Sequence, residues 1–380
     1  MMVSKLPSVG TTIFTVMSEL ARQKGAINLS QGFPDFDAPA PLLDRVQHYL
    51  RSGHNQYAPM MGAPTLRRAL AGKVKDCYGL SVDADREITV TSGATEALFC
   101  AVAAVVHAGD EVIVFDPVYD SYEPAITLQN ATTIHLPLKG PDYLPDWQQV
   151  ESAITSRTRA IMINTPHNPT GAVWSADDLK ALDTLVQQHG LYVIADEVYE
   201  HIVFDGRRHE SVCRYPGLYA RSFVVSSLGK TYHVTGWKIG YCVAPPNLTL
   251  EFRRVHQFVT FTSITPVQLG LGDFLAEHPE HHRELGAFYQ RKRDYFIRLL
   301  KGSRFRLKPS SGTYFQLLDY STITDEFDAD LAKRWTADVG VASIPLSVFY
   351  NVVPAQKLLR FCFAKHDSTL EQAAEKLCRL

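Results

Sequence analysis

The sequence lacks an excess of charge of either sign. Its 38 lysines and arginines are matched by 40 aspartates and glutamates, which gives a formal net charge of −2. Proteins that bind nucleic acid or an anionic membrane surface carry a basic field. We therefore expect no nucleic acid and no membrane among the partners of this chain.

Cysteine motifs and long apolar runs are also missing. The six cysteines are scattered and include no CxxC pair, so neither a zinc ribbon nor a disulfide framework is indicated. The longest apolar run, residues 97–106, is far shorter than the ~20 residues of a membrane-spanning helix. Residues 1–15 hold no cationic segment followed by an apolar core, so we expect no signal peptide. These absences predict a soluble, cytoplasmic protein.

The histidines and glutamate of residues 278–282 are the only group that resembles a metal-ligand cluster. They crowd the proline-containing start of a helix, where a solvated cluster is the simpler interpretation. No metal site is expected.

The chain is long enough, at 380 residues, for two or three compact units. From residue 87 onward, short apolar runs alternate with helical segments. Strands are expected at 88–91, 111–115, 159–164, 191–195 and 223–226, and helices at 96–107 and 175–189. This order is typical of an α/β fold with a largely parallel, doubly wound sheet that binds ligands at the carboxyl ends of its strands.

A smaller α+β unit is expected from the two ends of the chain. We assign residues 1–38 to an N-terminal arm and part of this small domain, residues 39–278 to the large domain, and residues 279–380 to the rest of the small domain. Such a unit is suited to closing over a substrate.

Lys230 lies between two apolar runs, residues 223–225 and 239–244, and is expected in a structured loop at the mouth of the sheet. A lysine confined among other cations has a lowered pKa, and its neutral amine attacks carbonyl groups. Ser227 and Lys238 offer a hydroxyl and a second cation, which together suit a phosphate. A phosphate beside an imine-forming lysine suggests pyridoxal phosphate (PLP). By itself a Gly-Lys pair is more often a surface turn.

Other turns carry groups suited to the same ligand. Residues 92–95, which include Gly93, Ala94 and Thr95, join a strand to a helix and direct backbone N–H groups at an anion. Tyr119 follows the next strand and is able to stack on a flat ring. Gly32, in a glycine-proline loop, lets the backbone approach a ligand. Plain connecting turns are the alternative for both glycine segments.

Polar groups also follow or interrupt three apolar strands. Asn168 lies in a loop stiffened by prolines. Asp196 follows the strand at 191–195, where a carboxylate needs a partner. A protonated ring nitrogen of PLP suits it, although a helix cap or a salt bridge is the alternative. Arg360 interrupts an apolar strand at 358–363 and therefore needs an anion.

Five motifs, in this order, resemble the class I PLP-dependent aminotransferases of fold type I over nearly the full chain. The closest likeness is to the branch of bacterial methionine aminotransferases and kynurenine/glutamine transaminases. The motifs are the loop at 31–35, Asn-Pro-Thr-Gly at 168–171, Asp-Glu-Val-Tyr at 196–199, Gly-Lys-Thr at 229–231 with Gly-Trp-Lys at 236–238, and Arg360.

The resemblance implies a role for each matched position. Lys230 forms the covalent imine with PLP and then shuttles the substrate proton. Asp196 pairs with the ring nitrogen, and Tyr199 joins these two as a catalytic residue. Asn168 and Tyr199 bind the phenolic oxygen of the ring, and Tyr119 stacks on its face. The implied phosphate ligands are Gly93, Ala94, Thr95, Ser227, Lys238 and, from a second subunit, Tyr57.

The resemblance also implies the substrate site. Arg360 binds the α-carboxylate as a fork, helped by Asn168 and Gly32. Residues 256–266, which reach the partner's active site in this branch, contain no arginine but include Phe261. With Phe14 and Phe33, this segment indicates an apolar or aromatic side-chain pocket, although an aromatic core is the alternative.

We therefore expect a homodimer with composite active sites. It would move the α-amino group of an apolar, thioether or aromatic L-amino acid, methionine favoured, to a 2-oxo acid by a ping-pong mechanism. A PLP-dependent C–S β-lyase acting on cysteine conjugates is the alternative, because it uses the same residues. A PLP-binding regulatory module lacks support, since no helix-turn-helix domain is attached. Lys238 departs from the aspartate-type pattern, in which an arginine binds the phosphate.

Overall fold

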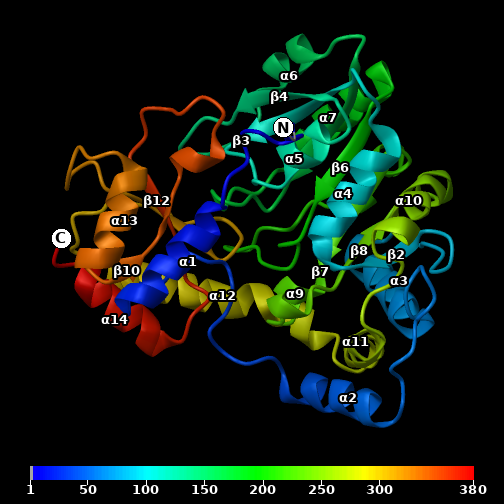
Figure 1. Ribbon diagram of the computed structural model, residues 1–380, viewed down its shortest axis with the longest axis horizontal. Helices are drawn as coiled ribbons and strands as arrows, with labels where there is room; N and C mark the ends of the chain where they lie inside the picture. Colours follow the sequence, from blue (N-terminus) through cyan, green and yellow to red (C-terminus); the bar gives the residue numbers. More distant parts are fainter. Residues whose placement is uncertain (1–2) are drawn as a thin grey trace.

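The computed structural model describes residues 3–380 and contains a central seven-stranded sheet (Figure 1). Its strands are β2 (Ile88–Thr91), β3 (Glu111–Asp116), β4 (Thr132–Pro137), β5 (Thr158–Asn164), β6 (Tyr192–Asp196), β7 (Ser222–Ser227) and β8 (Gly240–Val243). They lie in the order β2-β8-β7-β6-β5-β3-β4. Strand β8 is antiparallel to both neighbours, and the other pairs are parallel. The predicted doubly wound α/β fold is confirmed.

Helices cover both faces of this sheet. They are α2 (Ala40–Arg51), α3 (Pro64–Tyr78), α4 (Gly93–Val105), α5 (Tyr122–Thr127), α6 (Trp147–Ala153), α7 (Ala176–His189), α8 (Pro216–Tyr219), α9 (Leu228–Thr231), α10 (Pro246–Val259) and α11 (Thr265–Glu277). Ile161 and Ile163 of β5 share a core with α3, α7 and α11. Ala160 and Met162 face the opposite core, with α4, α5 and α10. Because both faces are buried, the strands read as continuous apolar runs.

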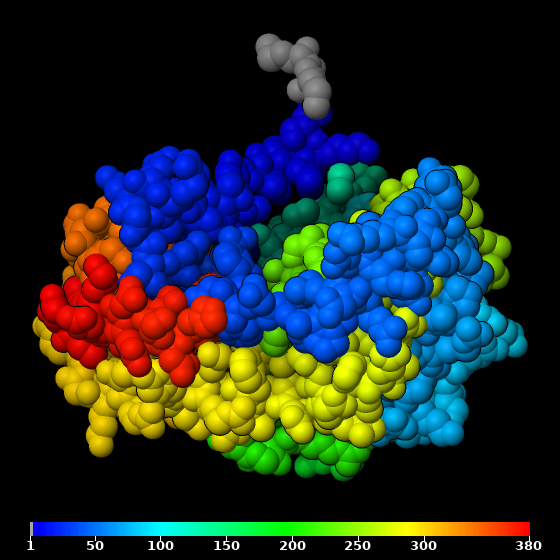
Figure 2. Space-filling view, turned by 90° about the horizontal axis from the view of Figure 1, so that it is seen from below, coloured from blue at the N-terminus to red at the C-terminus, as the bar shows by residue number. Residues whose placement is uncertain are grey.

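A second core joins the two ends of the chain. It contains the antiparallel sheet β11-β12-β9 and the parallel pair β1-β10. The strands are β1 (Ile27–Asn28), β9 (Phe315–Asp319), β10 (Val341–Ala342), β11 (Ile344–Pro345) and β12 (Leu358–Cys362), and the helices are α1 (Ile13–Lys24), α12 (Glu280–Leu299), α13 (Asp328–Asp338) and α14 (Asp367–Leu377). Helix α1 packs against α13. Seen from below, the blue N-terminal and red C-terminal segments lie next to each other (Figure 2).

Local signals explain where several elements begin and end. Thr12 caps α1 by accepting the Thr15 N–H, and Ser175 forms a capping box with Asp178 at the start of α7. Helix α4 begins at Gly93 and ends at Val105, whereas the sequence predicts 96–107. The predicted structured loop at Lys230 is instead the one-turn helix α9.

The segment 278–282 differs from the expected solvated cluster. His278 does pair with the exposed Glu280 over 3.0 Å. His282, however, is buried, and neither of its ring nitrogens has a hydrogen-bond partner within the described chain. Helix α12 begins at Glu280 and brings His282 inward against His201.

All six cysteines carry free thiols. Within residues 3–380, no helix combines the length and the apolar character needed to cross a bilayer.

Candidate active site

A cavity of about 380 Å³ opens where the carboxyl ends of β5, β6 and β7 meet α9 and β12. Every predicted site residue lines it except Tyr57 and Phe261. Asn164 and Asp196 are partners in the β5–β6 register, so the loops that follow these strands start at the same edge of the sheet. The fold thus brings distant motifs together, and their individual roles stay predictions.

Lys230 projects from α9, which follows β7 directly. Its Nζ donates hydrogen bonds to the Tyr314 hydroxyl over 3.0 Å and to the Gly32 carbonyl oxygen over 3.2 Å. Burial lowers the pKa of Lys230 to about 8, because the charged form loses its hydration. The neutral, nucleophilic amine is therefore far more populated near neutral pH than it is for an exposed lysine, although the ammonium still predominates at pH 7.

One end of the cavity is suited to a phosphate. The N-terminus of α4 directs the backbone of Gly93, Ala94 and Thr95 into it, and Lys238 Nζ donates to Thr95 Oγ1 over 3.4 Å. Gly93 has φ +74°, and a Cβ there would lie 3.0 Å from Lys238 Nζ. Only glycine fits that backbone and leaves the cation its place. Ser227 adds a hydroxyl from the end of β7, and together these groups form an anion site.

Asp196 lines the same cavity from the carboxyl end of β6. Its Oδ2 accepts the Tyr122 hydroxyl over 2.6 Å, and its Oδ1 accepts the Val198 N–H over 3.2 Å. Burial raises the pKa of Asp196 to about 6. A cationic N–H donor placed beside this carboxylate would lower that pKa and satisfy the buried charge. The carboxylate is therefore suited to a protonated ring nitrogen.

Arg360 enters the cavity from β12 and is almost completely buried. Its Nη1 donates to Asn168 Oδ1 and its Nη2 to the Ser30 carbonyl oxygen, each over 2.7 Å. Its Nε has no partner within the described chain. Burial lowers the pKa of Arg360 to about 10. A buried guanidinium that is bonded only to neutral acceptors needs an anion, and a carboxylate ligand supplies one.

Aromatic rings form the wall beside this guanidinium. The Arg360 guanidinium carbon lies 3.9 Å from the Phe315 ring centroid and 5.2 Å from that of Phe14. Phe33 lines the same cavity. A Cβ on Gly32 would lie 2.6 Å from Phe315 Cζ, so the close approach of this ring requires glycine at position 32.

Tyr57 and Phe261 lie outside the cavity of their own chain. Their rings pack edge to face, with centroids 5.6 Å apart, and 84% of Tyr57 and 42% of Phe261 is exposed. The adjacent Phe258 is 87% exposed. Such a cluster of exposed aromatic residues is typical of an interaction surface. Within one chain these residues add nothing to the site.

The sequence matches the family "Aminotransferase class I and II" over residues 24–377. The chain belongs to this family. It is 51% identical to methionine aminotransferase of Escherichia coli (strain K12), which covers 99% of this chain and 98% of the relative. It is 32% identical to human kynurenine–oxoglutarate transaminase 3, over 98% of this chain and 88% of the relative. The chain also superposes on the crystal structure of an E. coli protein whose structure and reactivity identify a methionine aminotransferase function. The TM-score is 0.98, at 51% identity and with 100% of both chains covered.

The resemblance predicted from the sequence is confirmed, and the chain is an aminotransferase. Members of this family use PLP. The chemistry of the cavity fits that group. Its anion site, its unpaired buried carboxylate and its amine of lowered pKa lie in one enclosure of suitable size.

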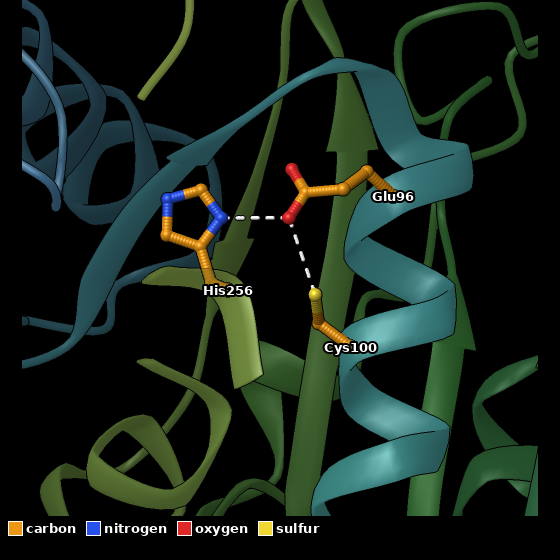
Figure 3. A group of neighbouring side chains, drawn as sticks. All are labelled: Glu96, Cys100 and His256. Atoms are coloured by element: carbon orange, nitrogen blue, oxygen red, sulfur yellow. Dashed lines mark hydrogen bonds and ion pairs between the residues drawn. The ribbon is translucent and has the colours of Figure 1, made fainter. Parts of the chain in front are cut away.

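A buried cluster supports the anion site of this aminotransferase from outside (Figure 3). His256 of α10 bonds Glu96 Oε1 through Nδ1 over 2.6 Å and the Met60 carbonyl oxygen through Nε2 over 2.9 Å. Glu96 Oε2 accepts the Ser92 N–H over 2.8 Å. Glu96, Cys100 and His256 are close enough to hold a metal ion, but their polar atoms already bond one another and the backbone. The cluster therefore fixes the first turn of α4.

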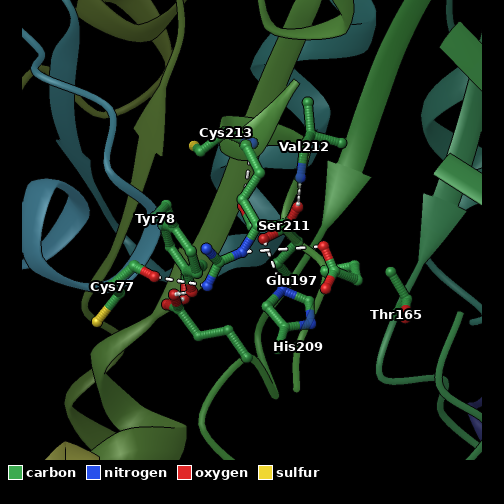
Figure 4. Close-up of polar contacts among 12 residues, drawn as sticks. Cys77, Tyr78, Thr165, Glu197, His209, Ser211, Val212 and Cys213 are labelled. Atoms are coloured by element: carbon green, nitrogen blue, oxygen red, sulfur yellow. Dashed lines mark hydrogen bonds and ion pairs between the residues drawn. The ribbon is translucent and has the colours of Figure 1, made fainter. Parts of the chain in front are cut away.

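Glu197 follows Asp196 but does not line the cavity, and its polar contacts are with His209 and Val212 (Figure 4). It accepts His209 Nε2 over 2.8 Å and the Val212 N–H over 2.9 Å. Of the two adjacent carboxylates, only Asp196 is therefore available to a ligand in the cavity.

Sequence reasoning missed three residues that touch the predicted ones. Tyr122 bonds Asp196, Tyr314 bonds Lys230, and Phe315 stacks on Arg360. Tyr122 is the first residue of α5 and lies three residues after Tyr119, and this nearness in sequence was the one available signal. Tyr314 and Phe315 belong to no recognised motif, and only the pairing of β9 with β12 brings them to the site.

Proposed function

We propose that this aminotransferase takes its amino group from an apolar, thioether or aromatic L-amino acid, with methionine favoured, and passes it to a 2-oxo acid in two half-reactions. The observation that carries the proposal is Arg360. It is a buried guanidinium with an unpartnered Nε, set against Phe14 and Phe315. One cation for the α-carboxylate and an aromatic wall for the side chain suit such a donor.

The donor preference has a second support. The E. coli relative at 51% identity is a methionine aminotransferase, and sulfur packs well against aromatic rings. A second carboxylate on the substrate would meet apolar side chains, because residues 256–266 contain no arginine. Burying that charge unpaired costs several kcal/mol.

PLP is the cofactor that we propose for the cavity. Lys230 would hold it covalently, Asp196 would keep its ring nitrogen protonated, and the start of α4 with Ser227 and Lys238 would hold its phosphate. Bound PLP supplies an electron sink that stabilises the charge left when the substrate Cα loses its proton. Tyr119 would stack on the ring, and Asn168 and Tyr199 would bond its phenolic oxygen.

The residues of this chain then divide the remaining work. Arg360 and Asn168 hold the substrate carboxylate, which orients the Cα–H bond. Lys230, when its amine is free, would accept the proton from the substrate Cα and hold it for return as the general acid. Gly32 and Phe33, on the loop above the cavity, limit the access of water.

Product analysis tests this proposal against the β-lyase alternative. With methionine and a 2-oxo acid, a transaminase forms the 2-oxo acid of methionine and a new amino acid in equal amounts and releases no ammonia. With a cysteine conjugate, a lyase releases pyruvate and ammonia even when no 2-oxo acid acceptor is added. We expect the first result. Ammonia release that does not depend on the 2-oxo acid would contradict the proposal.

A homodimer with composite sites is also proposed. Tyr57, Phe258 and Phe261 expose aromatic surface that residues 3–380 of their own chain leave uncovered, and Ser263, in the same segment as the two phenylalanines, bonds Ser92 beside the anion site over 2.8 Å. A symmetric partner would bury this surface and place Tyr57 and Phe261 at the other active site.

The division into a large domain, residues 39–278, and a small domain, residues 1–38 with 279–380, is proposed on the separate core of the chain ends. A cytoplasmic location is proposed on the free thiols.

A further inference from the structure

The Tyr314 hydroxyl lies behind Lys230, outside the lining of the cavity. Tyr314 is completely buried. Its hydroxyl accepts the Lys230 amine over 3.0 Å and donates to the Gly32 carbonyl oxygen over 2.6 Å. The same carbonyl oxygen accepts a second hydrogen from Lys230 over 3.2 Å. The three groups form a closed triangle.

A count of hydrogens fixes the direction of each bond. The Tyr314 hydroxyl has one hydrogen, which it gives to Gly32, so toward Lys230 it can only accept. A neutral amine has two hydrogens and one lone pair. With both hydrogens directed to Tyr314 and Gly32, the lone pair takes the remaining direction, away from both acceptors. After protonation, the third hydrogen of the ammonium lies in this same direction.

The triangle is held rigidly. The Tyr314 ring packs against those of Tyr199 and Tyr289, with centroids 5.1 Å and 5.6 Å away. A Cβ on Gly32 would lie 3.2 Å from Tyr314 Cε2, so the loop and the ring interlock. Burial raises the pKa of Tyr314 well above its usual value, and the hydroxyl therefore stays protonated and is not itself a base.

We propose that Tyr314 is a positioning residue. With the Gly32 carbonyl, it holds the free Lys230 amine so that the nitrogen lone pair points in one fixed direction. The amine accepts the substrate proton along this direction and later returns it along the same one. This inference rests on the proposed role of Lys230. It assigns a function to a hydroxyl that does not touch the substrate, and it explains why a tyrosine rather than a phenylalanine fills this place in a buried cluster of aromatic rings.

Tyr314→Phe tests the inference, with Tyr289→Phe as the matched control. Both variants keep the ring and lose one buried hydroxyl, but the Tyr289 hydroxyl bonds His233, not Lys230. The full-length enzyme is loaded with pyridoxamine phosphate, which leaves Lys230 free, and the lysine amines are titrated by NMR. The Lys230 signal is identified by its loss in Lys230→Ala.

We expect Tyr314→Phe to lower the pKa of Lys230 by about one unit, because the ammonium loses a hydrogen-bond acceptor. Tyr289→Phe is expected to leave that pKa unchanged. In the methionine half-reaction, Tyr314→Phe should lower the maximal rate about tenfold and leave the half-saturating methionine concentration within about twofold, since only the amine loses its alignment.

An unchanged Lys230 pKa in Tyr314→Phe, or an equal change in both variants, would overturn the inference. A loss confined to methionine binding would do the same. A failure of the proposed function gives a different result. Borohydride trapping of PLP on a residue other than Lys230 would disprove the proposed role of Lys230, independently of any effect of Tyr314→Phe.

Discussion

Arg360 Nη1 donates a hydrogen bond to Asn168 Oδ1 over 2.7 Å, inside the cavity. Arg360 belongs to β12 of the small sheet, and Asn168 follows β5 of the large sheet. The bond therefore connects two separately built parts of the molecule at the point where the substrate carboxylate is proposed to lie. It also pre-orients the guanidinium, whose Nε has no hydrogen-bond partner among the residues that the structure describes.

Arg360→Lys tests the substrate role of this guanidinium. A lysine supplies a point charge without the fork, so we expect kcat/KM for the amino-acid donor to fall by about 10²-fold or more. Arg306→Lys, an exposed position outside this cavity, is the control and should change nothing. Steady-state kinetics with methionine provide the measurement. Equal kcat/KM values in both variants would show that Arg360 does not bind the substrate carboxylate.

Lys230→Ala is expected to abolish turnover and covalent attachment while some PLP stays bound. The anion site at the start of α4 and the carboxylate of Asp196 do not depend on Lys230, so non-covalent binding persists. Borohydride reduction followed by peptide mapping measures the covalent link. A link at the wild-type level in the variant would show that another amine carries the cofactor.

Asp196→Ala is expected to slow the chemical step by about 10²-fold or more, because a ring without its proton is a poor electron sink. Substrate binding should change less. Glu197→Gln is the matched control, since Glu197 is an adjacent buried carboxylate that does not line the cavity. Exchange of the substrate Cα hydrogen with deuterated water is measured in both. The role assigned to Asp196 fails if its variant exchanges at the wild-type rate.

The proposed dimer predicts complementation between two inactive subunits. Lys230→Ala disables one site, and Tyr57→Ala, which removes an exposed side chain, is expected to weaken PLP binding at the partner's site. Mixed dimers then contain one site with both defects and one intact site, so activity should return toward half of the wild-type value per dimer. An active monomer in sedimentation experiments would rule out composite sites.

Much of the fold follows from the sequence because buried parallel strands leave a strong pattern. The run predicted at 191–195 is β6, displaced by one residue, and its apolar side chains meet helices on both faces. Lys230 was expected in a loop because the single turn of α9 is too short to show helical periodicity.

The site could be predicted where one residue violates its surroundings. Arg360 in an apolar strand and Asp196 after one are costly unless each has a partner, so the sequence indicates a ligand or an ion pair at both positions, and both line the cavity. Tyr122, Tyr314 and Phe315 satisfy local patterns and carry no such signal. Their contacts arise from distances between separate elements, whereas Tyr57 and Phe261 would contribute only through the proposed second subunit.

The most direct test of the account compares methionine, phenylalanine and aspartate in single-turnover half-reactions with the PLP-loaded enzyme. Conversion of the cofactor to its amine form is followed spectroscopically. Arg360, the one arginine among the described residues that line the cavity, and the aromatic wall beside it predict that methionine or phenylalanine reacts with a kcat/KM at least about 10²-fold above that of aspartate, with methionine the best of the three. A preference for aspartate would contradict both the pocket and the proposed donor.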